Sequence, residues 1–345
     1  MAKGACYGSE RRILQDEETG VTLIRLSGFP TINTHVYMHS RCFTFDSRDA
    51  VFYSNRLPSR DSPRDIFAVS TDGLRLRQLT DREGVGWMTC SPVERSVFYA
   101  CGTRIFEVSV DTFEEEEVVV SDLPHSIISV SKDGSRICSY CNSEGEGIVS
   151  MIDVKKKSSE VVYRHPSPIG HLQLDPSSSK SIIFHDTGPA GSPRIWCVDC
   201  DGSDARMLYD DRFGPPSHFV WLPGREVVVT TLQHPHRGIV LIDIDGGAEL
   251  LTEEHAFWHA GASPDGEILC SDTFNPDTGM YLVDVENGRA RKLCNPRSSN
   301  SHPQWTHPHP TWSPDGSMIL FNSDREGTPQ VYLCRVPQGL KAQCL

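Results

Sequence analysis

Short apolar runs recur along the whole chain, and the segments between them are rich in Gly, Pro, Asp and Ser. Within the runs, β-branched and aromatic residues alternate with small or polar residues, as in residues 50–54 and 147–152. The three-to-four-residue period of an amphipathic helix is nearly absent. Alternation bounded by turn residues is typical of β-strands. The pattern therefore predicts an all-β protein.

The strands belong to a repeated unit. Its clearest form is the tetrapeptide SPDG followed by an apolar run, at Ser263 and at Ser313. Weaker copies of the unit begin at Phe45, Ser91, Ser131, Asp175 and Leu222. In each unit a D-G dipeptide or its equivalent supplies a hairpin turn, and a second strand follows. Seven units at intervals of about 40 to 50 residues predict a seven-bladed β-propeller.

The two ends of the repeat are complementary. The last unit has no outermost strand after Val336, and the apolar segment 21–27 precedes the first complete unit with no sheet of its own. Pairing the two would close the ring and remove an exposed sheet edge. We therefore expect an N-terminal strand to join the last blade. We also expect one propeller domain over residues 21–337, an N-terminal extension over 1–20 and a C-terminal tail over 338–345.

Charge and hydropathy argue against some classes of binding partner and indicate where in the cell the protein acts. The net charge of −13 argues against a nucleic-acid partner, whose binding surface would be basic. No apolar stretch approaches the roughly 18 residues of a membrane helix. Residues 1–20 lack the apolar core of a secretory signal. We expect a cytoplasmic protein with no membrane partner, and we leave its oligomeric state open.

The 12 cysteines include two C-x-x-C pairs, Cys138 with Cys141 and Cys197 with Cys200. Both pairs lie in predicted strands, where residues three apart point to opposite faces. We interpret them as reduced structural thiols and not as zinc or redox sites.

Histidines gather just before the turns of three consecutive units. They are His218 in SHFVWLPG, His259 in WHAGASPDG, and the pair His307 and His309 in QWTHPHPTWSPDG. Innermost strands of a propeller converge on its axis, so these side chains would meet there. Imidazole and the amide of Gln304 would suit a borderline ion such as Mn, Fe, Co or Zn.

Other histidines fit this pattern less well. Single histidines at blade tops are commonly structural, and His171 and His185 are possible pocket residues without an assigned role. His234 and His236 follow a strand, so we expect them in a surface loop. His255 competes with His259 for a ligand position, and the position just before the turn favours His259.

From about Cys42 to Pro337 the chain resembles the oligogalacturonate lyases, which are seven-bladed propeller enzymes of pectin breakdown. The most specific part is QWTHPHPTWSPDGSMILFNSD, which is similar to the family's Q-x-x-H-P-H-P motif. The resemblance implies a metal site, with Mn²⁺ the expected ion. Its ligands would be His259, Gln304, His307 and His309. It also implies His218 as general base and Arg194, in PRIWCVD, as a second catalytic residue.

The implied reaction is β-elimination. A proton leaves C5 of a uronate beside the C6 carboxylate, the 4-linked sugar departs, and a 4,5-unsaturated uronate forms. The expected partner is a small acidic oligosaccharide, an oligogalacturonate. Two alternatives stay open: a non-catalytic TolB-like propeller scaffold and a lyase for a different 4-linked uronate. A third, a peptidase propeller, is disfavoured by the sequence. The last would need a G-x-S-x-G motif, which the chain lacks.

Overall fold

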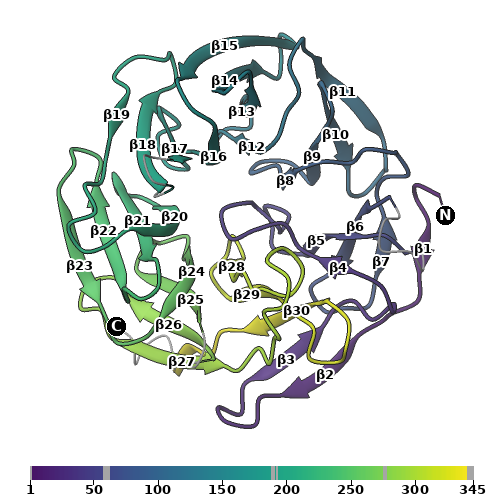
Figure 1. Ribbon diagram of the computed structural model, residues 1–345. Helices are drawn as coiled ribbons and strands as arrows, with labels where there is room; N and C mark the ends of the chain where they lie inside the picture. The colour runs from purple at the N-terminus through teal and green to yellow at the C-terminus, as the bar shows by residue number, and fades with distance from the viewer. Residues whose placement is uncertain (1, 57–62, 188–190, 192, 275–277, 340–345) are drawn as a thin grey trace.

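Seven antiparallel sheets are arranged radially around a common centre (Figure 1). The computed structural model describes residues 2–56, 63–187, 191, 193–274 and 278–339. The sheets confirm the predicted seven-bladed β-propeller. We number the blades 1 to 7 in the order of their innermost strands. No helix in these residues is long and apolar enough to cross a membrane.

Each blade contains four strands in meander order, from the innermost to the fourth, and the sheets of blades 1 and 7 have a fifth strand at the outer edge. The innermost strands of blades 1 to 7 are β4 (Asn33–Thr34), β8 (Met88–Cys90), β12 (Ile128–Val130), β16 (Ile169–Leu174), β20 (Pro216–Leu222), β24 (Phe257–Ala262) and β28 (Thr311–Trp312). The second strands are β5 (Asp49–Ser54), β9 (Ser96–Cys101), β13 (Arg136–Ser143), β17 (Ser181–Thr187), β21 (Val227–Leu232), β25 (Ile268–Thr273) and β29 (Met318–Ser323).

The outer half of each blade repeats in the same way. The third strands are β6 (Asp65–Ser70), β10 (Arg104–Ser109), β14 (Glu146–Asp153), β18 (Pro193–Asp199), β22 (Ile239–Asp243), β26 (Met280–Asp284) and β30 (Gln330–Arg335). The fourth strands are β7 (Leu76–Gln78), β11 (Glu115–Val120), β15 (Ser158–His165), β19 (Arg206–Met207), β23 (Ala248–Thr252), β27 (Ala290–Cys294) and, in blade 7, β3 (Thr22–Arg25).

The core lies between neighbouring blades. Strands β5 and β29 are buried along their whole length, because both faces of each sheet pack against another blade. The outer strand β11 exposes Glu116 and Glu117. This explains why the second strands read as continuous apolar runs, whereas the outer strands carry charge.

The SPDG tetrapeptide forms the turn between the first two strands of a blade. In blade 7 the Ser313 hydroxyl donates to Asp315 (2.6 Å) and accepts a hydrogen bond from the amide of Met318 (2.9 Å). Gly266, the last residue of the equivalent turn in blade 6, has a φ of +71°. A Cβ atom at Gly266 would lie 2.3 Å from the carbonyl oxygen of Pro223 in blade 5. Glycine is therefore needed both for the turn and for the contact between blades.

The ring closes through the N-terminal segment, as predicted. Strand β3 pairs with β30, with Leu23 opposite Cys334 and Ile24 opposite Leu333. Leu23 is fully buried beside Ile319 and Cys334. The fourth strand of the last blade thus comes from the start of the chain, and it covers an edge of β30 that would otherwise be open.

The segment that we expected to be an N-terminal extension contributes two further strands. Strand β1 (Cys6–Tyr7) pairs with β7 of blade 1, and β2 (Arg12–Gln15) pairs with β3 of blade 7. Both are too short or too polar to give a strong strand pattern in the sequence. Residues 340–345 of the expected tail lie outside the described residues. That residues 21–337 act as one domain stays a prediction.

Replacing Leu23 with alanine should destabilise the whole propeller, because it leaves a cavity at the closing strand pair. We expect a loss of about 2–5 kcal/mol in the free energy of unfolding, measured by equilibrium urea unfolding. Thr22→Ala, at an exposed position on the same strand, is the matched control and should stay within about 0.5 kcal/mol of the parent. Equal effects of the two substitutions would contradict a stabilising role for the closure.

Candidate metal centre

Three of the predicted ligand residues come together on the axis side of blades 6 and 7. His259, His307 and His309 are buried, and one potential ligand atom of each lies within 4.8 Å of the others. His259 is on β24, whereas His307 and His309 precede β28. The ring centroids of His259 and His309 are 4.3 Å apart. This arrangement brings imidazoles from two blades to one point.

The innermost strands of blades 4, 5 and 6 each contain a one-residue bulge beside a histidine. Strand β24 has three residue steps between Phe257 and Ala260, opposite two steps on β25, so an extra residue lies beside His259. Strands β16 and β20 carry the same bulge at His171 and His218. A bulge bends a strand and re-aims the side chains beside it. In three consecutive blades it therefore turns a histidine at an equivalent position.

Blade 7 carries a fourth histidine at this position. His309 lies four residues before the turn serine Ser313, as His259 lies four residues before Ser263. His309 has a φ of +49° and His171 a φ of +51°. These are left-handed conformations that histidine adopts at a cost, and such strain gathers at functional sites. The backbone is thus held in an unfavourable form where it presents imidazoles.

Asp272 orients His259. The buried Asp272 carboxylate faces the Nδ1 atom of His259 at 2.9 and 3.0 Å, and it accepts a hydrogen bond from the His259 amide at 2.7 Å. It also accepts one from the amide of His309 (3.4 Å). With Nδ1 bonded to the carboxylate, Nε2 of His259 points away from it and is available as a ligand atom. Burial raises the pKa of Asp272 to about 7.

The cluster fits a divalent cation. Burial lowers the pKa values of His259 and His309 well below the usual 6.5, so both rings are neutral and have a free lone pair. Among the described residues, the buried Nδ1 atom of His309 has no hydrogen-bond partner. A buried carboxylate behind neutral imidazoles is the common outer support of metal-binding histidines. A bound cation would satisfy the ring nitrogens and stabilise the Asp272 anion.

His218 lies beside this cluster. Its ring centroid is 4.2 Å from that of His259, and the Ser217 hydroxyl lies 2.9 Å from its Nδ1 atom. Burial, and next the proximity of His259, lower the pKa of His218 well below 6.5. The structure therefore holds a neutral imidazole in contact with a candidate ligand.

Tyr37 occupies the middle of the histidines, and the sequence pattern did not single it out. Its ring centroid is 4.5 Å from that of His309 and 5.3 Å from that of His171. Tyr37 belongs to the segment 35–42, which leaves β4 and crosses towards the axis; we call this segment the axial loop. The loop also carries His35 and His39 in the spacing H-x-Y-x-H. That spacing was the available signal, but it precedes no SPDG-like turn directly.

Gln304 lies apart from the three histidines in the contacts of the described residues. Its side chain is exposed, in a turn between β27 and β28. The amide of His302 donates to the Thr306 hydroxyl (2.9 Å), and the rings of His302 and Trp305 stack at 3.7 Å. This turn directs Gln304 to the surface. Its role as a fourth ligand stays a prediction.

Arg194 is held by a buried carboxylate on the neighbouring strand. Its guanidinium makes two hydrogen bonds to Asp186, one of 3.0 Å from Nε, and Asp186 also lies 3.0 Å from Nε2 of His165. His185 precedes Asp186 on β17, so its side chain points to the opposite face of the sheet. Its ring lies 4.7 Å from that of His171. Arg194 thus lies on the other face of blade 4 from the histidine cluster.

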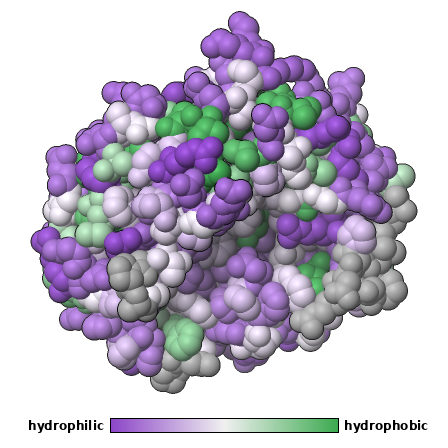
Figure 2. All heavy atoms as spheres, turned by 45° about the horizontal axis from the view of Figure 1, so that its top comes forward, coloured by the Kyte–Doolittle hydropathy of each residue, from purple (hydrophilic) through white to green (hydrophobic). Residues whose placement is uncertain are grey.

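The remaining candidates have ordinary surroundings. His234 and His236 are exposed between β21 and β22, as expected. His255 stacks on Tyr281 with centroids 4.0 Å apart. The cysteines that the structure describes are free thiols, including both C-x-x-C pairs. Figure 2 shows the molecular surface hollowed near the middle of one face, among hydrophilic and weakly polar residues.

Comparison with known proteins identifies relatives of this chain. The sequence profile of the oligogalacturonate lyase family matches residues 133–340. An oligogalacturonate lyase of Dickeya dadantii is 24% identical to this chain. The alignment covers 99% of this chain and 100% of the relative.

Two solved structures have the same fold. One, described as an oligogalacturonate lyase in complex with manganese, has a TM-score of 0.85 at 23% identity, with 99% of this chain and 100% of that chain covered. An oligogalacturonate lyase from Vibrio parahaemolyticus has a TM-score of 0.83 at 21% identity, with 98% and 100% covered. Because the family profile matches more than half of the residues and includes blades 4 to 7 with their histidines, this chain belongs to the oligogalacturonate lyase family.

Proposed function

We propose that this protein cleaves short oligogalacturonates by metal-dependent β-elimination, as a step in pectin breakdown in the cytoplasm. The observation that carries the proposal is the buried group of His259, His307 and His309, whose ligand atoms lie within 4.8 Å of one another. The three histidines lie in the part of the chain that matches the family. We propose Gln304 as the fourth ligand, which requires its turn to close over the site.

Manganese is the proposed ion. Imidazole nitrogens with one amide oxygen suit a borderline divalent ion better than calcium or magnesium, which prefer carboxylates. One structural relative is an oligogalacturonate lyase in complex with manganese. When bound, such an ion acts as a Lewis acid towards the uronate carboxylate and makes the C5 proton easier to remove.

His218 is the proposed base. Its neutral imidazole lies in contact with His259, so a uronate bound at the histidines would present C5 to it. The ring takes the C5 proton, the electrons of the C5–H bond form the C4=C5 double bond, and the C4–O bond breaks. The departing oxygen takes a proton from water or from a second side chain. The products are a 4,5-unsaturated uronate and a shortened oligosaccharide.

Arg194 is proposed to hold a substrate carboxylate. Its guanidinium is partly exposed and fixed by Asp186, and a planar guanidinium suits bidentate carboxylate recognition. Since Arg194 lies on the far face of blade 4 from His171 and His185, its carboxylate would belong to a sugar residue away from the scissile bond, or Arg194 would have to leave Asp186.

The first test is the ultraviolet absorbance of the product double bond. Purified protein with digalacturonate or trigalacturonate should show rising absorbance, chelation should stop it, and added Mn²⁺ should restore it. Oligomers of other 4-linked uronates are the second arm and would identify a lyase of different specificity. No absorbance change with any uronate, despite bound metal, would favour a non-catalytic propeller scaffold.

Alanine substitutions at His307 and His218 should separate ligand from base. His307→Ala is expected to lose bound metal and activity together, because two buried imidazoles remain where three were. His218→Ala is expected to lose turnover by at least about 100-fold and to keep its metal. Metal content by mass spectrometry and initial rates check both. Loss of metal in His218→Ala, or an active metal-free His307→Ala, would contradict the assigned roles.

Asp272→Asn should weaken the affinity for Mn²⁺ by about 10- to 100-fold, because the amide cannot replace the anion that orients His259. The measurement is competition with a metal chelator at equilibrium. Asp284→Asn is the matched control, since Asp284 is also a buried aspartate of blade 6 but bonds to a turn at Glu286 and Asn287. Equal affinities in the two variants would exclude a supporting role for Asp272.

A further inference from the structure

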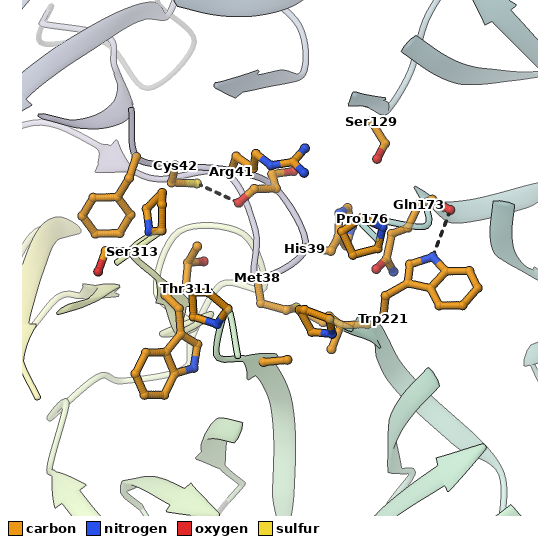
Figure 3. Close-up of a pocket in the computed structure, with 18 of the residues that line it drawn as sticks. Met38, His39, Arg41, Cys42, Ser129, Gln173, Pro176, Trp221, Thr311 and Ser313 are labelled. Carbon is orange, nitrogen blue, oxygen red and sulfur yellow. Dashed lines mark hydrogen bonds between the residues drawn. The ribbon is translucent and has the colours of Figure 1, made fainter. Parts of the chain in front are cut away.

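A cavity lies beside the axial loop, next to the strand residues that follow the clustered histidines. It has a volume of about 310 Å³. One wall is residues 38–43, and the other is formed by the ends of the innermost strands in blades 3 to 7 (Figure 3). The strand residues that line it, such as Gln173, Trp221 and Thr311, follow the equivalent histidines by two or three positions. At about 3.3 Å per residue, the cavity lies some 7–10 Å further along the axis.

Arg41 brings a cation into this cavity. Its NH1 atom donates to the carbonyl oxygen of Val130 (3.0 Å), and the side chain extends from the axial loop towards the strand of Ser129 (Figure 3). No ion pair joins Arg41 to a carboxylate among the residues that the structure describes. Burial lowers its pKa. A guanidinium has five N–H donors, so most of this cation's binding capacity is unused.

Arg41 differs from the two arginines that lie deepest beside carboxylates. The net charge is −13, and Arg77 bonds to Asp49 and Arg56 to Glu10. A cation that is removed from water without a counter-ion is unfavourable unless a ligand supplies the negative charge. Because Arg41 also lines a cavity, it offers a place for an anion.

The other walls combine indole and proline rings with polar residues such as Ser129 and Thr311. Trp221 and Trp312 occupy the position just before the turn in blades 5 and 7, and their Nε1 atoms donate to the carbonyl oxygens of Gln173 (3.4 Å) and Gly261 (3.0 Å). With their polar edges satisfied, the rings add apolar surface. A proline follows in the turn of each of four consecutive blades: Pro176, Pro223, Pro264 and Pro314. One cation among aromatic and proline rings favours a small, ring-shaped anion.

We propose that this cavity binds a small ring-shaped carboxylate, the class that includes monosaccharide uronates, with its carboxylate on Arg41 and its ring between the tryptophan and proline walls. The histidine cluster and the cavity share the axial loop as a partition. The site therefore accepts its ligand independently of the metal and of the proposed elimination.

The test is calorimetric titration of the chelated, metal-free protein with galacturonate, benzoate and galactose. One equivalent of a carboxylate should bind, and neutral galactose should not. Binding of galacturonate alone identifies a sugar acid as the ligand, and binding of benzoate as well identifies a general ring carboxylate. Failure of both to bind overturns the proposal, whatever the absorbance assay shows for turnover.

Three variants locate the binding. Arg41→Gln should lose at least tenfold in affinity. Ala262→Leu, which fills the cavity without touching the arginine, should lose it as well. Arg136→Gln is the matched control, because Arg136 also bonds to a backbone carbonyl, that of Ser179 (2.9 Å), but outside this cavity. His307→Ala should bind as the parent does. Unchanged affinity in both cavity variants, or loss in His307→Ala, would place the ligand elsewhere.

Discussion

The candidate site depends on one constraint of the repeat, the extra residue in the innermost strand. In blades 4, 5 and 6 the bulge includes the residue four positions before the turn that follows, and that residue is a histidine in each. Sheet pairing normally sends alternate side chains into the spaces between blades. The bulge interrupts that alternation and lets a polar ring face the axis while its neighbours stay in the apolar core.

Such a concentration of imidazoles is stable only if the rings stay neutral or share a cation. Burial lowers the pKa values of His171, His218 and His309 well below 6.5, so the cluster adds no positive charge near neutral pH. Tyr37 fills the space among the rings, and Asp272 supplies a carboxylate that faces His259 and His307. The site thus combines the lone pairs of neutral imidazole nitrogens with the carboxylate of Asp272. Its electrostatics favour binding a metal over binding protons.

The sequence repeat made the fold predictable. The site was less predictable, because several of its residues are positioned by contacts between segments that are far apart in the sequence. The SPDG turns predicted the number of blades, and the absence of an outer strand in the last repeat predicted the pairing of β3 with β30. The position of a histidine just before the turn favoured His259 over His255 as a ligand. The same rule could have included His171, which lies four residues before Asp175, the turn residue of blade 4.

Residues outside the repeat pattern were harder to place. Asp272 looks like any core strand residue until β25 is placed against β24, and Tyr37 reaches the axis from a loop that breaks the blade pattern. Arg194 and Gln304 were assigned from resemblance, and their positions depend on the Asp186 ion pair and on a polar turn. Local spacing contains no information about either contact.

The closure of the ring sets an order of events during synthesis of the chain. Strand β3 emerges from the ribosome near the start, but its partner β30 is among the last strands to appear. Until then the early strand has an unpaired edge, and blades 1 to 6 form an open arc. The histidines of blades 6 and 7 are also made late. The nascent protein therefore completes its ring and its candidate metal centre in the same final stage, so an interrupted chain would have neither.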